Sequence, residues 1–99
     1  MSQREDLIAL DNAKVASIEL AIGEESPWHY HTEVIETVIC LHGDISLQCR
    51  KPVENTLLKP GQRYKINPLH EHRLVNTGNG VATYLLVQSG RYDFIHSDS

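Results

Sequence analysis

A chain of 99 residues with 40% hydrophobic and 22% charged residues is long enough for one compact domain and too apolar to stay disordered. Its formal net charge is −4, and its nine basic residues form no stripe, so nucleic acid is not expected as a partner. No apolar stretch reaches the length that a bilayer requires, so no membrane partner is expected either.

The first residues, MSQREDLIAL, lack the basic start and long apolar run of a signal peptide. The two cysteines, Cys40 and Cys49, suit a reducing compartment, in which thiols stay free. We therefore expect a cytoplasmic protein whose cysteines do not pair.

Almost every segment has the apolar alternation of a short β-strand, and none repeats its apolar residues at a helical period. Turns containing Gly or Pro separate the strands, which predicts one all-β domain over residues 1–99, a sandwich or barrel with little or no helix. Residues 1–12 are expected to form an N-terminal arm or edge strand, and residues 96–99 a polar tail. The predicted strands are residues 14–22, 34–41, 44–50, 56–59, 64–66, 71–75, 81–88 and 92–95.

Two histidines and a glutamate stand close together before and within the second of these strands. His29 and His31 are separated by one residue, so an extended chain points both side chains the same way. Glu36 can return to the same place if the chain turns after His31. Two imidazoles and a carboxylate form a partial first shell for a divalent metal, and the alternative is three polar side chains scattered on a β-surface.

The spacing of these residues resembles the first sequence signature of the cupin superfamily. That signature is Gly, five residues, His-x-His, three or four residues, Glu, six residues, Gly. This chain matches it with Gly23, His29, His31, Glu36 and Gly43.

The second cupin signature is matched at Gly61, His72 and Asn76. It departs at the Pro-x-Gly element, where this chain has Asn67-Pro68-Leu69, so the proline is shifted by one and leucine replaces glycine. The resemblance, to small single-domain cupins, implies a jelly-roll β-barrel (a double-stranded β-helix), a metal near its open end with His72 as fourth ligand, and a homodimer.

Three imidazoles and one carboxylate suit one divalent transition metal, which could be Fe, Mn, Ni, Zn, Co or Cu. Four protein ligands on an octahedral ion leave two positions for other molecules. We therefore expect a mononuclear metal-dependent enzyme acting on a small polar organic molecule, of dioxygenase, isomerase, epimerase or lyase type. The alternatives are a non-catalytic small-molecule-binding or sensing module, and a structural protein with an empty site.

His70 shares parity with His72 and is a candidate acid or base near the metal, the alternative being a solvated loop histidine. If Glu36 faces inward, parity turns Val38 and Cys40 inward beneath the metal, where Cys40 fits a core residue better than a ligand.

Tyr30, between two inward histidines, should point outward. Trp28 either walls the entrance or packs on the rim, and His42 and His96 are expected in solvent. Candidate cavity residues are Tyr64, Tyr84, Leu86 and Gln88, an uncharged lining that disfavours a multiply anionic ligand unless Arg63 or Arg73 reaches the mouth.

Overall fold

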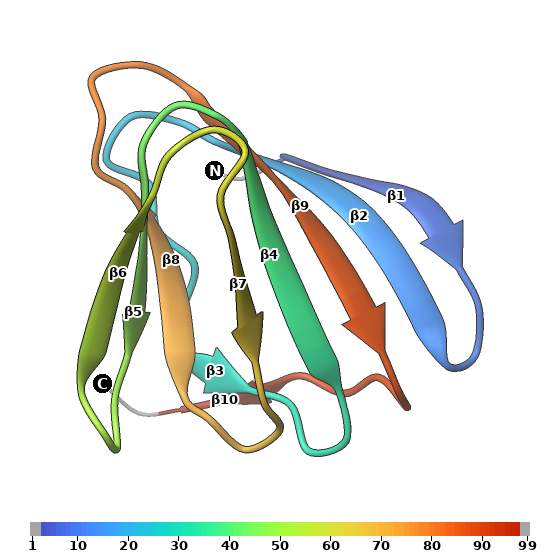
Figure 1. Cartoon of the computed structure of the whole chain (residues 1–99). Coiled ribbons are helices and arrows are strands. Elements are labelled where there is room, and N and C mark those ends of the chain that lie inside the picture. The colour runs from blue at the N-terminus through green and yellow to red at the C-terminus, as the bar shows by residue number, and fades with distance from the viewer. Residues whose placement is uncertain (1–2, 98–99) are drawn as a thin grey trace.

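A computed structural model describes residues 3–97, which form two antiparallel five-stranded sheets facing each other (Figure 1). None of the described residues belongs to a helix that could cross a bilayer. In spatial order, sheet A contains β1 (Gln3–Ala9), β2 (Ala13–Leu20), β9 (Ala82–Ser89), β4 (Ile35–His42) and β7 (Arg63–Ile66). Sheet B contains β10 (Ile95–His96), β3 (His29–Tyr30), β8 (His72–Asn76), β5 (Ile45–Cys49) and β6 (Glu54–Leu58).

The all-β jelly-roll prediction is confirmed, with one difference in its closure. Over residues 3–97 no strand pairing joins sheet A to sheet B, so the expected barrel is an open sandwich. The reason is that the edge strands pair on one side only. These are β1 and β7 in sheet A, and β6 and β10 in sheet B.

Alternation along the strands builds the core between the sheets, as their period of two requires. On β5, Ile45, Leu47 and Cys49 are buried while the residues between them are half-exposed. On β4, Val38 and Cys40 are buried, which confirms the predicted parity. Both cysteines are free thiols in this core.

Crossovers between the sheets bring distant parts of the chain into register at one end of the sandwich. Glu36 of β4 lies opposite Gln88 of β9. His29 of β3 lies opposite His72 of β8, whose other neighbour is Cys49 of β5. Polar residues far apart in sequence, such as Glu36 and Gln88 at fifty-two positions, thus share one end of the core.

At the N-terminal end, where an arm or edge strand was expected, Gln3–Ala9 form the edge strand β1, whose residues are all exposed. The C-terminal end differs from the sequence-based prediction. The last strand was predicted over residues 92–95 and instead covers Ile95–His96, because that pair hydrogen-bonds to β3. His96 is therefore in a strand, although exposed as expected, and residues 98–99 of the predicted tail lie outside the described residues.

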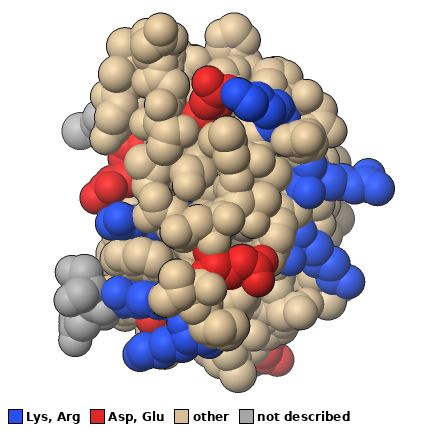
Figure 2. Space-filling view, turned by 60° about the vertical axis from the view of Figure 1, so that its left-hand side comes forward, with Lys and Arg blue, Asp and Glu red and all other residues tan. Residues whose placement is uncertain are grey.

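Charged side chains of both signs are interspersed among uncharged ones on the face drawn in Figure 2, which carries no large block of one sign. His42, predicted in solvent, is the exposed last residue of β4. At the turn after it, Gly43 has φ +82° and lies so close to β9 that a Cβ would be 3.0 Å from the Cα of Ala82. Only glycine fits this turn without strain.

Candidate metal centre

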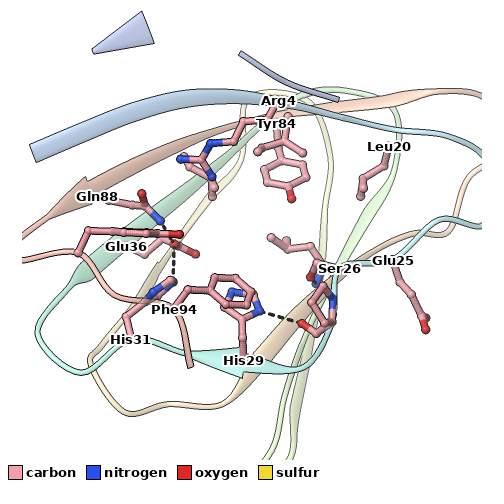
Figure 3. Close-up of a pocket in the computed structure, with 15 residues that line it drawn as sticks. Arg4, Leu20, Glu25, Ser26, His29, His31, Glu36, Tyr84, Gln88 and Phe94 are labelled. Carbon is pink, nitrogen blue, oxygen red and sulfur yellow. Dashed lines mark hydrogen bonds and ion pairs between the residues drawn. The ribbon is translucent and has the colours of Figure 1, made fainter. Parts of the chain in front are cut away.

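The structure brings together the four residues that the two signatures single out. His29 comes from β3, and His31 is the first residue after that strand. Glu36 comes from β4 and His72 from β8. All four side chains are buried, and their donor atoms lie within 4.8 Å of one another. Figure 3 shows His29, His31 and Glu36 of this group. Such a group could hold a metal ion.

Each imidazole is held in one orientation by a backbone carbonyl. The Nδ1 atoms of His29, His31 and His72 lie 2.8, 2.5 and 2.8 Å from the carbonyl oxygens of Pro27, Asp93 and His70. Since a carbonyl can only accept, Nδ1 carries the proton in each ring and Nε2 keeps its lone pair. This is the arrangement that orients histidine ligands of metals.

Glu36 lies between two of these lone pairs. Its Oε2 is 3.1 Å from Nε2 of His31 and its Oε1 is 3.3 Å from Nε2 of His72. Both nitrogens are buried without a hydrogen-bond partner, and with Nδ1 protonated each contact joins two acceptors. A cation between them satisfies all three groups, because ligands bound at about 2.1 Å and at right angles are about 3 Å apart. The donor set therefore fits a metal.

The side-chain amide of Gln88 completes the surroundings of the carboxylate. Its Nε2 donates to Oε2 of Glu36 at 2.7 Å, and both side chains are buried. The hydrogen bond fixes the rotation of the carboxylate, as supporting groups do around metal ligands. Gln88 had been predicted only as a possible cavity residue.

Burial and pairing set the protonation states of the cluster. Burial alone would raise the pKa of Glu36, but His31 and His72 outweigh it and hold that pKa well below its usual range. Burial, reinforced by His72, lowers the pKa of His29 to about 4. Burial opposes protonation of His31 too, but Glu36 and the carbonyl of Asp93 raise its pKa. A proton can therefore occupy the place between His31 and Glu36, so protons compete with a metal there.

The C-terminal segment covers the histidines from outside. The carboxylate of Asp93 accepts hydrogen bonds from the backbone N–H and the hydroxyl of Thr32, at 2.8 and 2.5 Å. The ring of Phe94 stacks on His29, with centroids 4.3 Å apart and planes 13° apart. Sequence reasoning missed both residues because they lie about sixty positions from the histidines and match neither signature.

A cavity of about 250 Å³ opens beside the cluster (Figure 3). Apolar side chains form part of its walls, and polar side chains, including His29, His31 and Glu36 of the cluster, form the rest. Tyr84, Leu86 and Gln88 line it as predicted, whereas Tyr64 packs on the core and its hydroxyl donates to Glu54. The apolar lining residues are Ile18, Leu20, Pro27, Leu74, Leu86 and Phe94.

The His70 side chain is not among the lining residues within the described chain. Its backbone carbonyl accepts the Nδ1–H of His72 and so positions that ring. An acid or base role for the His70 imidazole therefore stays a prediction. In the same loop Leu69 has φ 68°, and its N–H donates to the carbonyl of His31 at 2.7 Å. A left-handed conformation, which favours glycine, thus occurs at the position where the second signature has glycine.

Trp28 lies outside the cavity lining, beside Arg50 and Arg73, whose guanidinium carbons are 4.3 and 4.7 Å from the centre of its ring. Arg73 also donates to Gln48 and to Glu25, and its own side chain is not among the lining residues. Arg63 is exposed on β7 and lines a groove elsewhere. The only arginine at the cavity among the described residues is Arg4 of β1, a strand for which the sequence predicted no functional residue.

Comparisons with known proteins agree with this fold. The chain is similar to an uncharacterized conserved protein with a double-stranded beta-helix domain from Klebsiella pneumoniae (TM-score 0.86, 20% identity, 99% of this chain, 85% of that chain). It is also similar to the polyketide cyclase RemF from Streptomyces resistomycificus (0.84, 17%, 99% and 72%). A third similar structure is an oxalate oxidase (0.84, 15%, 96% and 54%), of which the chain spans about half the length.

At these identities the structural likeness shows the fold alone. A comparison with curated proteins finds no match. The family model of the cupin domain matches residues 16–88, which is most of the sequence and includes all four clustered residues. The chain therefore belongs to the cupin family.

Proposed function

We propose that the protein binds one divalent transition metal through His29, His31, Glu36 and His72, and acts on a small organic molecule in the adjoining cavity. One observation carries the proposal: three buried imidazoles have Nδ1 on a backbone carbonyl, and two of their Nε2 atoms face a carboxylate at close range without a hydrogen-bond partner. Iron, manganese, nickel, zinc, cobalt and copper all accept this donor set.

When bound, such a metal would supply Lewis-acid or redox chemistry at the inner end of the cavity. The residues of the chain contribute the rest. Gln88 holds the carboxylate of Glu36 in place, and the apolar walls keep most water away from a bound ligand. The hydroxyl of Tyr84 points into the cavity (Figure 3), and burial raises its pKa, so it stays a hydrogen-bond donor.

A metal-dependent enzyme is the function we favour, of dioxygenase, isomerase, epimerase or lyase type. Its support is the cavity beside the donor set and the likeness to an oxalate oxidase and a polyketide cyclase, two proteins whose names are those of enzymes. The second candidate is a non-catalytic binding or sensing module. Oxygen-uptake and isomerisation screens with each metal separate the two, because a binding module gives saturable binding without turnover.

Metal content tests the ligand set. We expect about one equivalent of metal in purified wild-type protein, and a small fraction of that in a His31→Ala/His72→Ala double variant. The control is His42→Ala, which removes an exposed histidine outside the cluster and should leave metal content unchanged. Circular dichroism confirms that the variants are folded. A double variant that retains full metal content would contradict the assignment.

We also propose a homodimer that uses the outer face of sheet A. The outward face of β4 carries apolar side chains, of which Ile35 and Leu41 are exposed. Beside them a groove is lined by Thr37, Ile39 and Val87 among others. Light scattering after gel filtration should give twice the mass of the 11.2 kDa chain, and an Ile39→Lys variant should give the monomer mass.

A cytoplasmic location is part of the proposal, supported by two free, buried thiols, as is usual in reducing compartments. Fractionation of cells that express the protein tests it. Recovery of the protein outside the cytoplasmic fraction would contradict it.

A further inference from the structure

Arg4 gives the cavity a positive charge. In β1 it lies opposite Ile18 of β2, and since paired residues of neighbouring strands share a face, both reach the cavity. Figure 3 shows the guanidinium on the side of the cavity opposite His29 and His31. Within residues 3–97, no other Lys or Arg side chain is among those that line the cavity.

The guanidinium of Arg4 is hydrogen-bonded to the protein at its Nε. Its Nε donates to Oδ1 of Asp6 at 2.9 Å, and the Arg4 side chain is 36% exposed. Asp6 therefore occupies the Nε side of the fork, and within residues 3–97 the edge formed by the two terminal nitrogens has no hydrogen-bond partner. That edge matches a planar carboxylate, which it binds through two parallel N–H···O bonds.

Other groups restrict what can bind at this edge. Tyr84, whose hydroxyl points into the same cavity, adds an uncharged donor. Glu25 and Glu36 also line the cavity and Asp6 is bonded to Arg4, so a second negative charge on the ligand would meet these carboxylates. The cavity volume of about 250 Å³ equals roughly eight water molecules at about 30 Å³ each. The lining therefore favours a small ligand with one negative charge.

We infer that the cavity takes a small organic monocarboxylate, whose carboxylate is bound by Arg4 with help from Tyr84, while its apolar part packs on the walls toward the histidine cluster. Arg4 thereby determines the specificity for a carboxylate. It is the arginine at the cavity, where Arg63 or Arg73 had been considered. The inference names the ligand class of the proposed metal site, and so rests on the proposed function for what happens after binding. The Arg4 contact itself is independent of the metal.

Titration of the ¹⁵N-labelled, zinc-loaded protein with butyrate and with butyramide tests this inference, because the two probes have the same shape and differ in charge. Hydrogen bonds between charged groups contribute about 1.5–3 kcal/mol, so butyrate should bind about tenfold tighter or more. Arg4→Gln should reduce the preference to about twofold or less, and Arg4→Lys, which keeps the charge and loses the fork, should lie between. The control is Arg63→Gln, which removes an exposed arginine outside the cavity and should keep the full preference.

The same titrations after treatment with a chelator separate this inference from the proposed metal function. A wild-type protein that takes up no zinc, but prefers butyrate in a manner that depends on Arg4, refutes the metal and supports the carboxylate site. A protein that binds zinc but binds the two probes equally, or binds neither, refutes the carboxylate site. Retention of the preference in a folded Arg4→Gln variant refutes it too.

Discussion

Replacing Leu69 by glycine should stabilise the protein. Leu69 has φ 68°, a left-handed conformation that costs an ordinary L-residue about 1–2 kcal/mol. Glycine avoids that cost but loses about 0.5–1 kcal/mol through the greater entropy of its unfolded state. The leucine is 66% exposed, so little packing is lost. The net gain is about 0.5–1 kcal/mol, which raises the Tm by about 2–8 °C for a domain of this size.

Urea unfolding followed by circular dichroism measures this change. Leu57→Gly is the matched control, because Leu57 is similarly exposed, at 50%, but lies within the regular strand β6. There glycine should destabilise by about 1 kcal/mol. If Leu69→Gly is no more stable than wild type, the strain attributed to residue 69 is wrong. Metal content should stay at the wild-type level, because the Leu69 side chain is outside the cluster.

Three further predictions concern the core and its turns. Asn76→Ala removes the side-chain amide that donates to three backbone carbonyls. The free energy of unfolding in urea should fall by about 2 kcal/mol or more. An equal fall for Asn79→Ala, in an exposed loop, would contradict this. Gly43→Ala should cost about 2 kcal/mol or more from its positive φ and its contact with Ala82, and an unchanged midpoint would refute the close approach. Burial raises the pKa of Cys49 from its ordinary 9.0 to about 11. The contribution of this buried thiol to the free energy of unfolding is therefore complete below pH 9 and is lost as the pH rises toward 11. The loss is at most about 1.4 kcal/mol per pH unit. Cys49→Ala should remove this share of the alkaline loss in urea unfolding, and an identical pH profile would contradict it.

The alternation of side chains along the strands predicted which residues face the inside of the sandwich. The period of two placed Val38 and Cys40 on the inner face once Glu36 was assigned inward, and it turned His29 and His31 the same way. These predictions succeeded because alternation depends only on neighbours along the chain. The positions of turns were predictable for the same reason.

Contacts between distant segments were not predictable in this way. Arg4 lies in an exposed strand and Phe94 in a short segment before β10, and neither belongs to a periodic pattern that extends to the histidines. Their places depend on which strands pair, and in this fold neighbours in space are often far apart in sequence. The second signature located His72, but nothing local indicated that Asp93 would accept the Nδ1–H of His31.

In the proposed site one metal binds between the three imidazoles and Glu36. Anomalous diffraction, recorded on either side of the absorption edge of the metal found in purified protein, tests this binding. We expect a single anomalous peak per chain, within bonding distance of Nε2 of His29, His31 and His72 and of a Glu36 carboxylate oxygen. Metal-loaded crystals that show no peak at this position would contradict it.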